Sequence, residues 1–159
     1  MQASSVVTIG TDAGVSALAL LEGMSDHGVL TSIDPDAERQ AAARKVLSLA
    51  RIRSNQVRLI TGTPLDVLPK LRDGAYDMVL INGDRLEYVE YVSQALRLLR
   101  TGGIVVVNDA LANNHVADPD NEDDDTLIIR ETLDSVLETE EFTPVLLPVG
   151  EGLLLATKS

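Results

Sequence analysis

Short apolar runs alternate along the chain with stretches in which apolar residues recur at helical spacing. Runs of four to six residues rich in Val, Ile and Leu are typical of buried strands, whereas recurrence at i, i+3 and i+7 indicates an amphipathic helix. The runs predict strands over residues 5–9, 29–33, 57–60, 76–81, 104–107, 143–147 and 153–156. Helices are expected over residues 14–25, 36–50 and 126–137, from Thr63 onward, and around Val89, Val92, Leu96 and Leu99.

Several of these elements carry a prediction about their orientation. In the helix over 36–50, the spacing puts Ala42, Val46 and Leu49 on the inward face, and in the helix over 126–137 it puts Ile129, Leu133, Val136 and Leu137 there. The strand over 104–107 is continuously apolar, which predicts burial on both faces. The last two strands flank Gly150 and Gly152, so we expect an antiparallel hairpin at the edge of the sheet.

Strand and helix alternate at the spacing of an α/β domain, with a mostly parallel sheet and helices on both faces. We find no linker or repeat, so residues 1–159 are expected to form a single domain. Ligands of such sheets bind beyond the carboxyl ends of the strands. Five segments follow predicted strands and direct the search for a site: Gly10–Gly14, Asp34, Gly62-Thr63, Asn82–Asp84 and Asn108-Asp109.

The charge narrows the function classes. Thirteen Lys and Arg against 25 Asp and Glu give a net charge of −12, which disfavours nucleic acid and anionic membranes as partners. The acids are concentrated in residues 118–141, which contain 11 acids and a single base, Arg130. Eight bases lie in residues 36–72. The chain has no cysteine, which excludes thiol catalysis and Cys-ligated zinc. It opens without a signal-peptide pattern, so a cytoplasmic protein is the expectation.

Three of the five segments describe a pocket for an adenosyl group without phosphates. The loop Gly10-Thr11-Asp12-Ala13-Gly14 has G-x-x-x-G spacing rather than the G-x-G-x-x-G of dinucleotide sites. Asp12 would repel a diphosphate but tolerates an ammonium or sulfonium group. Asp34 ends the second strand, where an acid can accept both ribose hydroxyls, although it could instead cap the next helix. Thr63 offers a partner to an adenine edge or simply starts a helix.

The motifs together resemble a known family. The run 8–20, TIGTDAGVSALAL, is similar to the E-I-G-T-x-x-G-x-S-A-L-x-L motif of class I S-adenosylmethionine-dependent O-methyltransferases of the caffeoyl-CoA and bacterial catechol O-methyltransferase type. Further stretches agree in order and spacing with the family's ribose-binding strand and with its D-A-D-K-x-x-Y-x-x-Y, L-L-x-x-G-G and D-N-x-L motifs. They are residues 30–34, 82–91, 98–103 and 108–111.

The resemblance implies a Rossmann-like methyltransferase fold with a seven-stranded sheet, S-adenosylmethionine as cofactor and a small hydroxylated molecule as acceptor. Relatives are commonly dimers, so a homodimer is expected. By position, the glycines would lie under the methionine part, Asp34 would bind ribose and Thr63-Pro64 would face adenine. The residues expected to bind the cofactor are Gly10, Thr11, Asp12, Gly14, Ser16, Asp34, Thr63, Pro64 and Asn82.

The sequence departs from the family at positions that matter for chemistry. The family's divalent cation is held by the first Asp of D-A-D and the D-N pair, and these positions are Asn82, Asn108 and Asp109 here. Because hard cations bind through anionic oxygens, weak or absent metal binding is expected. Thr8 replaces the acid that opens the first motif, Ala112 replaces an aromatic residue, and the family's N-terminal helices are absent from the given chain.

The remaining candidates for catalysis are Asp109 and then Asp84, either of which could remove a proton from the acceptor. His27 and His115 fall in predicted loops and are read as surface residues. The leading hypothesis is therefore methyl transfer to a hydroxyl of a small molecule. A non-catalytic protein that binds S-adenosylmethionine with a degenerate active site stays open, and a nicotinamide-dependent oxidoreductase is disfavoured by the glycine spacing.

Overall fold

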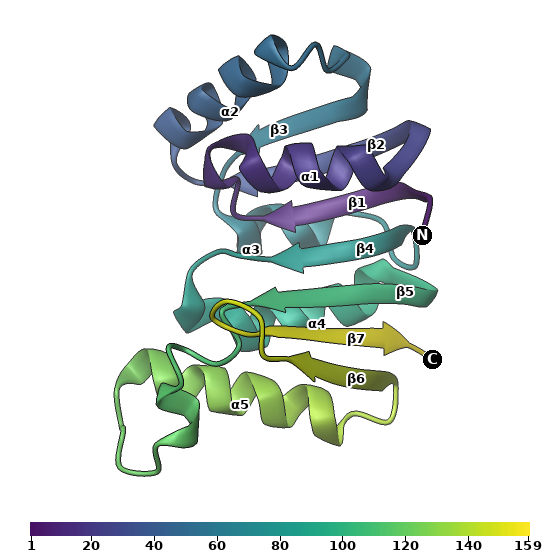
Figure 1. The fold of residues 1–159 in the computed structure, drawn as a ribbon. Helices are drawn as coiled ribbons and strands as arrows, with labels where there is room; N and C mark the ends of the chain where they lie inside the picture. The colour runs from purple at the N-terminus through teal and green to yellow at the C-terminus, as the bar shows by residue number, and fades with distance from the viewer.

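The computed structural model describes residues 1–159, and its centre is one seven-stranded sheet in the order β3-β2-β1-β4-β5-β7-β6 (Figure 1). Strands β3 to β5 run parallel, and β7 is antiparallel to both β5 and β6. The strands are β1 (Ala3–Ile9), β2 (Met24–Asp34), β3 (Val57–Thr61), β4 (Tyr76–Ile81), β5 (Leu99–Asn108), β6 (Phe142–Leu147) and β7 (Leu153–Lys158). The helices are α1 (Val15–Gly23), α2 (Ala37–Leu49), α3 (Pro64–Val67), α4 (Tyr88–Leu98) and α5 (Asp124–Glu138).

The predicted α/β class, the mostly parallel sheet and the C-terminal hairpin are confirmed. Helices cover both faces: α1 and α2 lie in front of the strands β1 to β3 in Figure 1, and α3 and α4 lie behind the sheet. Helix α5 packs against α4 and β6. The chain builds outward from β1 to β3 and then returns to place β4 on the other side of β1. This reversal makes the carboxyl ends of β1 and β4 the switch point of the sheet.

Strand β5 is less covered than its sequence predicts. Val105 and Val107 are buried in the main core, but Ile104 and Val106, which point to the other face, are only half-buried. The prediction of burial on both faces was therefore wrong. The reason is that α1 lies over β1 and β2, and no helix crosses β5 on that face (Figure 1). The strand is also longer than predicted, because pairing with β4 begins at Leu99.

Helix α2 presents a different face from the predicted one. Its buried residues are Gln40, Ala43 and Leu47, whereas Leu49 is 76% exposed. The cause is a close contact with the loop after β1: a Cβ built on Gly14 would lie 3.1 Å from the Cα of Ala43. An approach this close needs a small side chain on the face of α2 that meets this loop, and Ala43 provides it. The helical spacing of alanines alone could not distinguish the two faces.

The other differences concern element ends. Helix α1 stops at Gly23, not Ser25, because β2 begins at Met24, where that residue pairs with Ala3 of β1. In α5, Ile129 and Val136 are buried as predicted and Leu133 is half-buried, but Leu137 is 62% exposed and belongs to the outer face. No helix of the structure has the length and apolarity that crossing a bilayer requires.

Candidate functional site

A cavity of about 380 Å³ opens where β1, β2 and β4 end. Five of the predicted cofactor-binding residues come together around it, and four (Thr11, Asp12, Gly14 and Ser16) lie outside its lining. Because the cavity lies at the switch point, it has the position in which open parallel sheets bind ligands. We call it the switch-point cavity. Its lining is Gly10, Asp34, Pro35, Asp36, Arg39, Thr63, Pro64, Asn82, Gly83, Asp84, Glu87 and Tyr91.

Gly10 forms the floor of the cavity by bringing two strand ends together. Its φ is +91°, and a Cβ at this position would lie 2.1 Å from the carbonyl oxygen of Asn82. The amide of Asn82 in turn donates to the carbonyl of Ile9 (2.8 Å). Both the positive φ and the contact require glycine. The residue therefore serves first to let the ends of β1 and β4 approach each other. The surface of the cavity at this point is a consequence of that approach.

Asp34 is buried, with 2% of its surface exposed, at the end of β2. Its Oδ2 accepts from the amide of Thr11 (2.9 Å), and its Oδ1 accepts from the amide of Asp36 (2.8 Å). The helix cap is supplied by Asp36, which accepts from Glu38 and Arg39. A carboxylate offers about four acceptor positions, so each oxygen of Asp34 has one remaining. Asp34 can thus accept two further hydrogen bonds on the side that lines the cavity.

A cluster of buried hydroxyl groups supports the loop that follows β1. The hydroxyl of Thr8 donates to Ser32 (2.8 Å), and Ser32 also shares a hydrogen bond with the hydroxyl of Thr11 (2.8 Å). All three residues are at most 1% exposed. Thr8 therefore lies in a structural network between β1 and β2, and it does not line the cavity as a ligand-binding acid would.

The far wall of the cavity is acidic. Asp84 is exposed and accepts from the amide of Leu86 (3.0 Å), so it caps the 3₁₀ turn Arg85–Glu87. Glu87 accepts from the hydroxyl of Tyr91, and burial together with this hydrogen bond raises the pKa of Tyr91 above its ordinary value. Tyr91 is therefore a neutral hydrogen-bond donor at neutral pH. Neither Glu87 nor Arg39 was predicted from the sequence to line the site. Glu87 lies in the turn before α4 and Arg39 in the first turn of α2, and the spacing of residues along the chain does not show that these two turns meet at one cavity.

The positions that hold a metal in the resembled family are occupied here by groups that pair with one another. The side-chain amide of Asn108 donates to Oδ1 of Asn82 (2.9 Å). Asp109 accepts from Arg85 (2.9 Å), whose other terminal nitrogen lies 3.6 Å from Asp125. Hydrogen bonding to Asp109 raises the pKa of Arg85 further, so the guanidinium stays charged. A divalent cation needs several free anionic oxygens, and these residues do not offer them.

The structure holds no group of three or more His, Asp or Glu side chains with the geometry of a metal site. Asp109 itself has a φ of +56° in the turn after β5 and is half-buried. A second cavity, of about 330 Å³, lies beside the Arg85–Asp109 pair and is lined by Arg85, Ala112, Asn113, His115 and residues 123–126. His115 and His27 are both exposed, in agreement with the prediction of surface histidines, but His27 lies in strand β2 and not in a loop as predicted.

Comparisons with known proteins find relatives along almost the whole chain. A model of the O-methyltransferase family matches residues 1–159. A protein of Mycobacterium tuberculosis named as an O-methyltransferase is 41% identical over 153 residues, which cover 96% of this chain and 68% of the relative. A crystal structure of a Corynebacterium glutamicum protein superposes with a TM-score of 0.93 at 32% identity, covering 99% of this chain and 73% of the other.

A second solved structure is informative about ligands. It is the O-methyltransferase TomG from Streptomyces achromogenes, described as involved in tomaymycin synthesis and crystallised in complex with S-adenosylmethionine. It superposes with a TM-score of 0.91 at 28% identity, covering 99% of this chain and 74% of TomG.

Proposed function

The chain belongs to the O-methyltransferase family, and we propose that it transfers the methyl group of S-adenosylmethionine, bound in the switch-point cavity, to a hydroxyl group of a small molecule. The observation that carries the proposal is the lining of that cavity. It holds four carboxylates, Asp34, Asp36, Asp84 and Glu87, and one cation, Arg39, which pairs with Asp36. Such a lining repels phosphates and favours a donor that carries sulfonium and ammonium groups.

The proposed donor contacts follow from the free hydrogen-bonding positions. The two remaining acceptor positions of Asp34 suit the two hydroxyls of a ribose. Thr63 and Pro64 line the cavity at the start of α3 and are proposed to face the adenine. The bound donor supplies an electrophilic methyl group on sulfur. Asp12 is exposed and does not line the cavity, so its proposed contact with the donor requires a movement of the loop after β1.

The chemistry left to the protein is orientation of the acceptor and removal of its proton. Asp109 is hydrogen-bonded to Arg85. Asp84 lines the cavity, and one of its carboxylate oxygens caps the 3₁₀ turn while the other is unpaired. We therefore propose Asp84 as the proton acceptor. Asp109 is proposed to fix the Arg85 guanidinium, which can donate to the acceptor oxygen as negative charge develops on it. No step requires a metal.

Calorimetry with S-adenosylhomocysteine tests the donor pocket. We expect binding to the folded protein, and we expect Asp34→Ala to weaken it by about 1–3 kcal/mol, because buried donors and the ribose hydroxyls lose their partner. Asp66→Ala, which removes an exposed acid outside the cavity, is the matched control and should leave the affinity unchanged. No heat at millimolar ligand, or an unchanged affinity in Asp34→Ala, would reject the assignment.

Turnover distinguishes the enzyme from a protein that only binds the donor. Asp84→Asn should lower the rate of methyl transfer to hydroxylated acceptors by much more than it lowers the affinity for S-adenosylhomocysteine. If the unsubstituted protein binds the donor product but methylates no acceptor in a panel of phenols and hydroxy acids, the binding protein is the better description. A homodimer and a cytoplasmic location stay predictions, and sedimentation of the purified protein tests the first.

A further inference from the structure

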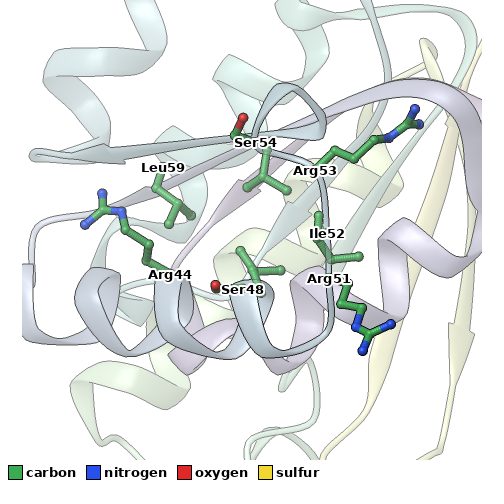
Figure 2. Close-up of a pocket in the computed structure, with 9 residues that line it drawn as sticks. Arg44, Ser48, Arg51, Ile52, Arg53, Ser54 and Leu59 are labelled. Carbon is green, nitrogen blue, oxygen red and sulfur yellow. The ribbon is translucent and has the colours of Figure 1, made fainter.

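A groove lies at the end of the molecule opposite the switch-point cavity, between the C-terminal part of α2, the loop after it and β3 (Figure 2). Its volume is about 420 Å³, which is in the range of small-molecule sites. We call it the α2–β3 groove. Its lining is Arg44, Leu47, Ser48, Arg51, Ile52, Arg53, Ser54, Val57 and Leu59.

The floor of the groove is apolar. Leu47 is 5% exposed, and Ile52, Val57 and Leu59 are half-buried at the edge of the smaller of the two hydrophobic cores. They come from α2, from the loop after it and from β3. The hydroxyls of Ser48 and Ser54, which belong to the lining, make no hydrogen bond within the protein. The groove therefore offers an apolar surface with a few free hydrogen-bonding groups.

The rim of the groove is cationic in a chain whose net charge is −12. Arg44, Arg51 and Arg53 belong to no ion pair. The guanidinium of Arg53 donates to the carbonyl of Asp26 (2.7 Å), while those of Arg44 and Arg51 have no partner. Figure 2 shows the three side chains leaving the groove in different directions. A cation near a helix C-terminus stabilises the helix dipole, but this does not explain the exposed apolar floor between the arginines.

Arg51 occupies a backbone conformation that normally selects glycine. Its φ is +59°. The amide of Ile52 donates to the carbonyl of Leu47, and that of Arg51 donates to Ser48, both at 3.0 Å. This is the paired hydrogen-bond pattern of a helix end in which the residue with left-handed φ is usually glycine. An arginine here carries a strain of about 1 kcal/mol. The position therefore keeps a guanidinium where the backbone alone would favour glycine.

We propose that the α2–β3 groove binds an organic carboxylate with an apolar chain, such as a medium-chain fatty acid. The chain would lie on Leu47, Ile52, Val57 and Leu59, and the carboxylate would meet the unpaired guanidinium of Arg51, with Arg44 adding positive charge at the rim. Arginine binds carboxylates through two parallel hydrogen bonds, which suits this head group. The size of the groove and its apolar floor favour a small amphiphile over an inorganic anion, and the acidity of the rest of the surface disfavours an anionic membrane.

Calorimetry with octanoate on the full chain tests this, with octylamine as a ligand of the same chain and opposite charge. Octanoate is expected to bind and octylamine is not. Arg51→Gly should weaken octanoate by about tenfold. Because glycine accepts the positive φ, this variant should unfold at the same or a higher urea concentration, so a loss of binding cannot be attributed to misfolding.

Two further variants complete the design. Arg44→Ala should also weaken octanoate, and Arg72→Ala, an exposed arginine outside the groove, should not. Equal affinity for octanoate and octylamine, or unchanged octanoate affinity in both Arg51→Gly and Arg44→Ala, would overturn the proposal. Self-association of the protein that is abolished by Arg51→Gly but persists in the presence of octanoate would also overturn the proposal. The groove would then hold a second copy of the chain. Binding of S-adenosylhomocysteine should be the same in all three variants.

Discussion

Asp34 connects the switch-point cavity to the interior of the sheet through a short series of contacts. Its carboxylate holds the amide of Thr11, whose hydroxyl bonds Ser32, which in turn accepts from Thr8. Thr8 and Ser32 are also paired residues in the register of β1 and β2. Each hydroxyl is buried, so each needs its partner. The position of Asp34 is therefore set by strand pairing and not by the loop alone.

Gly10 is the residue for which we expect the largest effect of a single methyl group. Gly10→Ala places a Cβ 2.1 Å from the carbonyl oxygen of Asn82 at a φ of +91°. Strain and overpacking together should lower the free energy of unfolding by about 3 kcal/mol. Urea unfolding followed by circular dichroism measures this.

The matched control is Gly74→Ala. Gly74 also has a positive φ, of +60°, but no heavy atom lies within 4 Å of the added Cβ. The control should therefore show the strain alone, about 1 kcal/mol. Equal losses in the two variants would mean that the contact with Asn82 relaxes at no cost.

Some candidate residues of the site could be predicted from the sequence and others could not. The acid at the end of β2 and the glycine after β1 could be placed from the sequence, because both follow apolar runs whose ends are clear. The requirement for glycine at position 10 could not be predicted from the sequence. It depends on Asn82, which is 72 positions away and contacts Gly10 only because β1 and β4 pair in parallel. The pairing of Asn82 with Asn108 and of Arg85 with Asp109 is long-range in the same sense.

At the scale of elements, α5 organises the acidic segment that precedes it. Its half-buried Arg130 donates to the carbonyls of Val116 (3.1 Å), Asn121 (2.8 Å), His115 (3.1 Å) and Asp118. Arg130 is also the one base among the 11 acids of residues 118–141. A single guanidinium thus ties a segment of self-repelling charges to a helix.

Arg130→Met keeps the length of the side chain and removes its donors. We expect the backbone amides of residues 115–121 to exchange with deuterium about tenfold faster or more, because hydrogen bonds to a charged donor are worth about 1.5–3 kcal/mol. Hydrogen-exchange mass spectrometry measures this segment by segment. Glu131→Met, at the next and exposed position of the same helix, should leave the exchange unchanged. Equal exchange in both variants would show that the segment is held by other contacts.

Element types were predictable from the sequence, while element faces were not always. Every predicted strand is present, and β4 has the predicted ends, because it begins and ends where the apolar run does. The prediction of which face of α2 is buried was wrong. The alanines of α2 are compatible with burial of either face, and the contact of Ala43 with Gly14 decides between them. The early start of β2 was missed because residues 24–28 are not an apolar run; Met24 pairs with Ala3 of β1, and the register then shifts before Val29 pairs with Ser5.

At the scale of the whole molecule, one buried acid joins three adjacent strands at the end of the sheet opposite the switch-point cavity. Asp77 of β4 accepts from the amides of Ser4 (2.7 Å) and Ser5 (2.9 Å) of β1 and from Arg100 of β5 (2.7 Å). Burial by itself raises the pKa of Asp77, but the hydrogen bonds from Arg100, Ser4 and Ser5 lower it by more. The net pKa is below the ordinary value of an aspartate.

This direction fixes the sign of a pH dependence. A carboxyl whose pKa is lower in the folded state stabilises the fold fully above its unfolded-state pKa of about 4, and the contribution is lost as the pH falls through the folded-state value. Asp77→Asn should therefore lower the free energy of unfolding by about 2 kcal/mol near pH 7. The difference from the unsubstituted protein should shrink as the pH falls below about 4, which urea unfolding at a series of pH values measures.

Asp66→Asn is the control for this series, because Asp66 is exposed and its carboxylate makes no hydrogen bond within the protein. It should follow the unsubstituted protein at every pH. In a chain with a net charge of −12, protonation also relieves repulsion between acids, so the control separates that general effect from the contribution of Asp77. A loss in Asp77→Asn that stays constant from pH 7 to about pH 3 would mean that packing of the side chain, and not its charge, joins the three strands.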